Sequence, residues 1–387
     1  MKLIKPLLLF LFTTIAFTGF SQTVIVPSSV KLPDDTIIRN QLINSLNGFL
    51  SQKENPNNQN SYVFKADLLE TSDLLDEIKG MEQNNALKAD NFYKCYLTNA
   101  IGIDEDNFII QIAYIGISNN TPVLHAGFRL LAKRIDGKFF FNSPLKQNTI
   151  GWRSKKLGML TCYYKDTLTL TAVRQYQKTV LFYDKKLGGK TYPTAFYYCD
   201  NFAEVQQLIG IDYKSDYNSI KYNSLTSHEN NLSLILNGND YSWQRFNAHD
   251  LWHERLRLVV APAKINRPVD EGCAYLYGGD WSFTWNEVLA KFKKYAANNP
   301  NADWLKLYIN NTAYEYGDKP MIISYVLNAL VVQKIEAEKG FAQVMELLSC
   351  GHRQNGDENY FTALNKIAGI NKGNFNVKMW ELIKAAN

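Results

Sequence analysis

The chain has 387 residues, of which 46% are apolar and 20% charged, so it is long enough for two domains that each bury a full core. The formal net charge of +5 is small and the basic residues are scattered, so the sequence does not argue for a nucleic-acid partner. The five cysteines are too few and too widely spaced for a disulfide framework or a CxxC metal site. We therefore expect mostly buried thiols, with at most one bridge.

The first 21 residues have the pattern of a signal peptide. Lys2 and Lys5 supply a positively charged start, residues 6–17 are largely apolar, and small residues up to Ser21 provide a cleavage site. The apolar run is shorter than the ~20 residues that a membrane-spanning helix needs, so an uncleaved anchor is the less favoured interpretation. The sequence predicts a secreted or periplasmic protein with no stable membrane insertion after signal cleavage.

Residues 22–150 are predicted to form an N-terminal α+β domain. Apolar residues at helical spacing predict helices over residues 34–50 and 66–81. Alternating apolar and aromatic residues, separated by turn signals such as Asn-Asn and Asp-Gly, then predict antiparallel strands over residues 92–103, 107–118 and 122–142. Helices followed by long strands are typical of the α+β class. In element order alone, this part resembles the cystatin or NTF2-like kind of small domain.

Residues 151–387 are predicted to form a second, mostly helical domain with a small sheet. Residues 143–165 contain glycines and a proline and are interpreted as the connection into it. A helix is expected over residues 166–187, capped by Asp166 and ended by two glycines. A strand at residues 194–199 and a short helix, with Asp200 or Asn201 as its cap, should follow.

Residues 232–236 read Leu-Ser-Leu-Ile-Leu and predict a strand just before the histidine-bearing segment described below. Two interpretations of this strand stay open. It lines a cleft and offers its edge to an extended substrate, or it is an ordinary core strand. Beyond residue 280 the apolar spacing is helical. The expected helices cover residues 284–299, 302–311, 320–340, 341–351, 360–370 and 374–386.

The most informative stretch is residues 248–279, which read AHDLWHERLRLVVAPAKINRPVDEGCAYLYGG. His249 and His253 lie four residues apart, a spacing that places both imidazoles on one face of a helix. Glu271 opens a second helical stretch that is able to bring a carboxylate back to the first. Two imidazoles and a carboxylate around an open fourth position form a catalytic zinc site in many hydrolases.

These two motifs resemble those of the gluzincin branch of the HExxH zinc metallopeptidases, in particular the secreted peptidase-MA-like proteins. In that family the paired histidines are followed by a second helix with an EGxAxY-type motif that ends in small residues, and here residues 271–275 read EGCAY and residues 278–279 are glycines. The resemblance implies one Zn²⁺ held by His249, His253 and Glu271, a peptide or protein substrate, and hydrolysis of peptide bonds. It covers residues 170–387 and is carried mainly by the three ligands.

The first motif departs from the family pattern at one position, because Asp250 stands where the family has its general-base Glu. The resemblance implies that Asp250 takes the proton from the zinc-activated water, with a side chain one methylene shorter. A shortfall of about 1 Å can cost ~100-fold in rate when positioning carries the reaction. An aromatic hydroxyl that stabilises the oxyanion is also implied, for which Tyr325 is the candidate.

Three functions remain open on the sequence. The first is an exported zinc-dependent peptidase, with weakened activity because of Asp250. The second is a catalytically inactive homologue that keeps the fold and the metal and acts as a binding or structural protein. The third is a protein without a metal, in which the histidine spacing is a coincidence.

Overall fold

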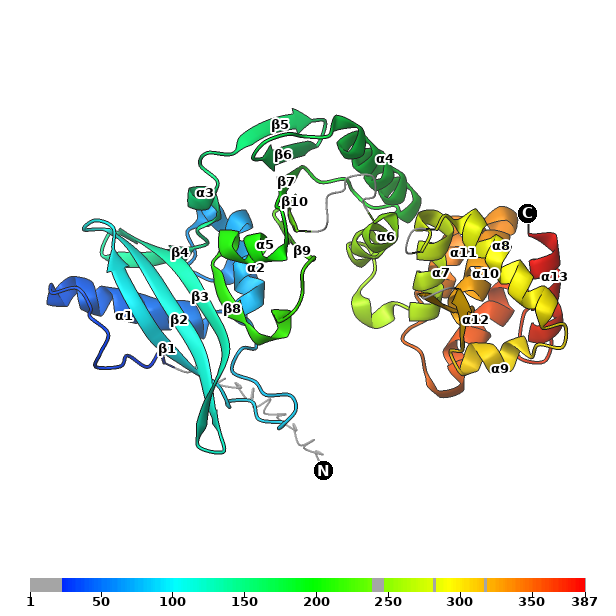
Figure 1. Cartoon of the computed structure of the whole chain (residues 1–387), viewed down its shortest axis with the longest axis horizontal. Helices are drawn as coiled ribbons and strands as arrows, with labels where there is room; N and C mark the ends of the chain where they lie inside the picture. The colour runs from blue at the N-terminus through cyan, green and yellow to red at the C-terminus, as the bar shows by residue number, and fades with distance from the viewer. Residues whose placement is uncertain (1–22, 239–246, 281–282, 317–318, 387) are drawn as a thin grey trace, which may run out of the picture. The chain divides into compact units, whose positions relative to one another are not determined.

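The computed structural model describes residues 23–238, 247–280, 283–316 and 319–386 (Figure 1). With 46% helix, 24% strand and antiparallel sheets, it confirms the predicted α+β class. The predicted signal peptide lies outside the described residues. Each helix within the described residues is too short or too polar to traverse a lipid bilayer. All five cysteines are free thiols. Four of them are buried, and Cys350 is half-buried.

Contacts group the chain into two compact units. The first contains the described residues up to Lys155, together with Cys162–Lys165 and residues 194–238. The second contains Lys156–Thr161, Asp166–Pro193 and the described residues from 247 onward. This grouping is not the same as the predicted division at residue 150, because residues 194–238 associate with the first unit.

The first unit is built on an antiparallel sheet of order β1-β2-β3-β4, with β8 also pairing with β3. Helix α1 (Thr36–Ser51) packs on this sheet, where the Phe49 and Phe141 rings lie 5.1 Å apart. Its N-cap is Asp35, whose side chain accepts from the backbone of Ile37 and Ile38. The second helix is α2 (Leu68–Ile78). The strands are β1 (Lys94–Gly102), β2 (Asn107–Ser118), β3 (Thr121–Ile135), β4 (Lys138–Asn142) and β8 (Ile211–Lys214).

A second sheet has the order β5-β6-β7-β10-β9. Its strands are β5 (Arg153–Leu157), β6 (Leu160–Tyr164), β7 (Thr194–Tyr198), β9 (Ser224–Glu229) and β10 (Leu232–Asn237). Residues 143–165, predicted as the connection into the second part, form β5, β6 and the short helix α3 (Leu145–Asn148), and the chain passes between the two units within them. Asn201, and not Asp200, caps α5 (Phe202–Ile209) by accepting from the backbone of Glu204.

Strand β10 settles one of the open alternatives. It pairs with β7 on one side in parallel and with β9 on the other side antiparallel. Its Leu234 and Leu236 side chains are fully buried. Because both of its edges are already hydrogen-bonded, β10 has no edge to offer to a substrate, and the core-strand interpretation holds.

The second unit is mostly helical. Helix α4 runs from Leu170 to Leu187 and has Thr169 at its N-cap, so the predicted cap at Asp166 is wrong. It ends at Gly188 in the left-handed conformation (φ 67°), as the glycine pair predicts. The other helices are α6 (Ala248–Arg257), α7 (Arg267–Gly278), α8 (Trp285–Asn298), α9 (Trp304–Ile309), α10 (Ile323–Lys339), α11 (Phe341–Leu348), α12 (Glu358–Ala368) and α13 (Phe375–Ala385).

Helix α10 is the centre of this unit, and α7 packs beside it (Figure 1). Its apolar side chains are buried around most of its circumference, as the fully enclosed Val326, Ala329 and Val332 illustrate. The helix begins later than predicted, because residues up to Ile322 form β12 (Lys319–Ile322), which pairs with β11 (Ala313–Tyr316). Helix α7 therefore packs against a helix that the core of this unit surrounds.

Candidate metal centre

Helix α6 carries the two histidines on one face, as their spacing predicts. Asn247 caps the helix, and its side-chain oxygen accepts from the backbone N–H of His249 at 3.1 Å. The imidazole rings of His249 and His253 have centroids 4.9 Å apart. Both side chains are mostly enclosed, with 13% and 14% exposed, so the rings are held in a partly dry environment.

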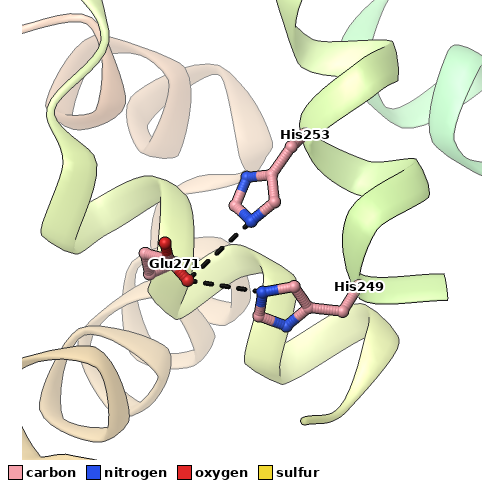
Figure 2. A group of neighbouring side chains, drawn as sticks. All are labelled: His249, His253 and Glu271. Carbon is pink, nitrogen blue, oxygen red and sulfur yellow. Dashed lines mark ion pairs between the residues drawn. The ribbon is translucent and has the colours of Figure 1, made fainter. Parts of the chain in front are cut away.

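Glu271 approaches this histidine face from α7 (Figure 2). Its Oε2 atom lies 3.3 Å from Nε2 of His249 and 3.8 Å from Nε2 of His253. One ligand atom of each of the three residues lies within 4.8 Å of the other two, and among the described residues this is the group with that property. The three residues predicted as ligands are therefore brought together by two separate helices.

The other nitrogen of each ring is held by an acceptor. Nδ1 of His249 lies 2.8 Å from the backbone oxygen of Gly279, and Nδ1 of His253 lies 2.9 Å from both carboxylate oxygens of Asp270. A carbonyl oxygen only accepts, so Nδ1 of His249 carries a proton, and in the neutral imidazole the lone pair lies on Nε2. The Asp270 carboxylate favours the same tautomer for His253. Hydrogen bonds of this kind orient metal-binding histidines and raise their basicity.

Asp270 was missed in the sequence reasoning. It is buried and also accepts from Nε1 of Trp252 at 3.0 Å, so one carboxylate orients two side chains of α6. A signal for it existed. Pro268 near the N-terminus of α7 indicates that the helix begins at Arg267, which places two successive carboxylates in its first turns. The family motif points only to the second of these carboxylates, that of Glu271.

The glycines of the second motif have a packing role. A Cβ atom at Gly278 would lie 2.5 Å from the backbone nitrogen of His249, and one at Gly272 would lie 2.8 Å from that of Ala329 in α10. Contacts this short do not occur between real Cβ and backbone atoms. The two glycines therefore let α7 approach α6 near one end and α10 near the other, which places Glu271 against the imidazoles.

A buried ion pair fixes the opposite side of α6. Arg255 donates to Asp184 of α4 from Nε at 2.7 Å and from a terminal nitrogen at 2.9 Å, and both side chains are 6% exposed. The Asp184 carboxylate also accepts from Thr191 at 2.7 Å. The Tyr183 hydroxyl donates to the backbone oxygen of Ala248 at 3.0 Å, at the start of the histidine helix. Helix α6 is thus held from both sides.

The electrostatics of the three ligands are coupled. Burial acts to raise the pKa of Glu271, but the hydrogen bond with His249 and the neighbouring imidazole and Arg267 charges hold it below its ordinary value. For His249, burial acts to lower the pKa, and the contacts with Glu271 and Gly279 outweigh it, so the pKa is raised. Without a cation the site therefore favours a charged Glu271 carboxylate paired with a protonated His249, and a metal ion has to displace that proton in order to bind Nε2.

The two residues predicted to be catalytic have different surroundings. Tyr325 on α10 is half-buried, its ring lies 5.9 Å from that of Tyr275, and its hydroxyl interacts electrostatically with Arg267, which lies beside Glu271. Asp250 is exposed and lies outside the three-residue group, and its carboxylate accepts from the side-chain amide of Asn247. The neighbouring Tyr314 is a core residue, buried with its hydroxyl on the sulfur of Met321 at 3.4 Å.

Comparison of the chain with protein-family models, with curated proteins and with solved structures finds no match. Two imidazole nitrogens and one carboxylate oxygen are the donor set that catalytic zinc takes from proteins, with further positions left for water and substrate. Nε2 lone pairs aimed at a charged carboxylate fit that ion.

Proposed function

We propose that this chain is an exported zinc-dependent peptidase-like protein that hydrolyses peptide bonds. The observation that carries the proposal is the meeting of His249 Nε2, His253 Nε2 and Glu271 Oε2, with both Nδ1 atoms held by acceptors. Side chains of a chance histidine pair would have no reason to be oriented by second partners in this way. The resemblance to gluzincin motifs supports zinc as the ion.

Residues of the chain would transfer the proton and stabilise the oxyanion. A bound zinc ion supplies a water molecule of lowered pKa and polarises the substrate carbonyl. Asp250 would accept the proton of the attacking water and return it to the leaving amine. Tyr325 would donate a hydrogen bond to the carbonyl oxygen as negative charge develops on it. Burial is the largest influence that raises the pKa of Tyr325, so its hydroxyl keeps its proton and remains a donor at neutral pH.

At the level of the fold, we propose a gluzincin-like arrangement for the second unit and a cystatin-like or NTF2-like arrangement for the first. The packing of α7 on α10 and of Glu271 on the α6 histidines supports the former. The packing of α1 on an antiparallel sheet supports the latter. The predicted signal sequence supports export.

The experiment is a cleavage assay on a denatured protein substrate with zinc-loaded wild type, Asp250→Glu and His249→Ala. We expect slow cleavage by wild type and ~10–100-fold faster cleavage by Asp250→Glu, because the longer side chain restores the reach of the base. His249→Ala should be inactive, which controls for contaminating proteases. Absence of cleavage by both wild type and Asp250→Glu while zinc is bound would refute the peptidase assignment.

One observation favours a second function. The Asp250 carboxylate is exposed and engaged by Asn247 at the helix cap, which is a structural role that needs no catalysis. A catalytically inactive homologue would keep the zinc for stability and act as a binding or structural protein. It predicts that zinc raises the melting temperature of wild type, and that only Asp250→Glu cleaves the substrate.

A further inference from the structure

The two oxygens of the Glu271 carboxylate face different partners. Oε2 faces the imidazoles, whereas Oε1 lies 3.4 Å from a terminal nitrogen of Arg267. Arg267 is the first residue of α7 and lies one helical turn before Glu271, so both side chains leave the same face of the helix. The Arg267 guanidinium therefore lies at the edge of the candidate metal centre, beside Glu271.

Arg267 is held loosely. Its side chain is 75% exposed, and its contacts are Oε1 of Glu271 and the hydroxyl of Tyr325. Arg353 also interacts electrostatically with Tyr325, but its guanidinium is already paired. It donates two hydrogen bonds to the Asp357 carboxylate, each with an N–O distance of 2.7 Å. Arg353 therefore has a structural role, while Arg267 keeps donors directed to solvent beside the ligands.

The charge balance around Arg267 changes when a divalent cation binds. The cation would neutralise the negative charge of the Glu271 carboxylate. The exposed Arg267 guanidinium would then no longer have a fully charged carboxylate beside it. Two nearby carboxylates are already engaged, Asp270 by His253 and Trp252, and Asp280 by the Tyr275 hydroxyl. The positive charge at this edge of the site is therefore that of Arg267, beside the neutral Tyr325 hydroxyl.

We propose that Arg267 binds a carboxylate of the substrate beside the metal and so sets the substrate class. The planar fork of an arginine matches a carboxylate with two parallel hydrogen bonds, and the Tyr325 hydroxyl stays available for the carbonyl oxygen. The carboxylate is either the C-terminal one of a peptide or that of an acidic side chain. This inference rests on the proposed function, because the carboxylate must lie near a bound zinc ion.

Three thiol probes test this proposal by binding, without any need for turnover. Mercaptoacetyl-leucine carries a free C-terminal carboxylate, mercaptoacetyl-leucinamide carries none, and mercaptoacetyl-glutamic acid α-amide carries only a side-chain carboxylate. The thiolate anchors each probe on zinc. Dissociation constants are measured by calorimetry on zinc-loaded wild type, Arg267→Gln and Lys264→Gln. Lys264 is an exposed cation three residues earlier and serves as the matched control.

In wild type and in Lys264→Gln we expect at least one carboxylate probe to bind about tenfold tighter than the leucinamide, which suits an exposed charge-assisted contact. The preferred probe identifies the source of the carboxylate. In Arg267→Gln the preference should fall to about one. Equal binding of all three probes to zinc-loaded wild type, or a preference that survives Arg267→Gln, would overturn the carboxylate site while leaving the zinc centre intact. A wild type that takes up no zinc would overturn both.

Discussion

The carboxylate of Asp270 lies with both of its oxygens 2.9 Å from Nδ1 of His253, while the next residue, Glu271, has its Oε2 atom 3.8 Å from Nε2 of the same ring. Two successive residues of α7 therefore face the two different nitrogens of one imidazole ring. Partners of this kind commonly change metal affinity 10–100-fold, although they never touch the ion. The arrangement makes Asp270 the residue whose removal tests the orientation of the site.

Replacing Asp270 by Asn should weaken zinc binding by about 10–100-fold, because the amide holds the His253 ring less firmly and removes a nearby negative charge. Competition with a chromogenic chelator measures the affinity. Asp250→Asn is the control, since it makes the same change on an exposed carboxylate of α6 and should shift the affinity by no more than a few fold. Equal affinities for the two variants would argue against an orienting role for Asp270.

Gly278→Ala should destabilise the second unit and loosen the metal centre together. The new methyl group would meet the His249 backbone at 2.5 Å, which forces α6 and α7 apart. An overpacked contact of this kind costs about 1–3 kcal/mol. Urea unfolding and zinc content measure the two effects. Gly151→Ala is the matched control because a Cβ there meets nothing within 4 Å, and similar losses in both variants would refute the packing explanation.

The sequence predicted the histidine pair well because the signal is local, four residues along one helix. The same holds for the end of α4 at Gly188. Glu271 was predicted as a ligand because small residues follow it in the motif. The structure gives two of these residues, Gly272 and Gly278, a steric role, since a Cβ atom at either position would clash with a neighbouring helix.

What the sequence did not predict depends on neighbours that are distant along the chain. The basic run at residues 153–157 has no apolar alternation, and it becomes β5 because β6 pairs with it. The role of Asp270 depends on Trp252 and His253, which lie 18 and 17 residues earlier, on α6. The sequence left two interpretations of β10 open, and only its pairing with β7 and β9 decides for the core strand.

Arg255→Met should reduce the free energy of unfolding by about 3–5 kcal/mol, because it leaves the buried Asp184 carboxylate without its charged partner. The double variant Asp184→Asn with Arg255→Met should recover part of that loss, since no uncompensated charge remains. Denaturant unfolding followed by circular dichroism gives both values. Arg257→Met, at an exposed position on the same helix, should cost little. A loss from Arg255→Met no larger than that control would mean that the pair does not anchor α6.

Asp73 provides a pH-dependent test in the first unit. Burial in α2, followed by the charges of Asp76 and Glu77, raises its pKa well above the ordinary value. The native state then holds a proton that the unfolded chain releases, so this group's contribution to stability falls as the pH rises above about 4. Asp73→Asn removes that loss and should stabilise the protein by about 1–3 kcal/mol at pH 8, with little effect near pH 4.

Unfolding curves of Asp73→Asn and wild type across this pH range supply the measurement. Asp90→Asn, at an exposed position, is the control and should follow wild type at each pH. A stabilisation by Asp73→Asn that does not change between pH 4 and pH 8 would contradict the raised pKa.

The central claim is that His249, His253 and Glu271 hold one divalent ion, and elemental analysis of protein purified without a histidine tag tests it most directly. The same measurement separates zinc from Fe²⁺, which other proteins bind with two histidines and a carboxylate. We predict about one equivalent of zinc in wild type and its loss in His249→Ala, with both proteins folded by circular dichroism. Wild type without metal, or zinc that remains in His249→Ala, would contradict the account.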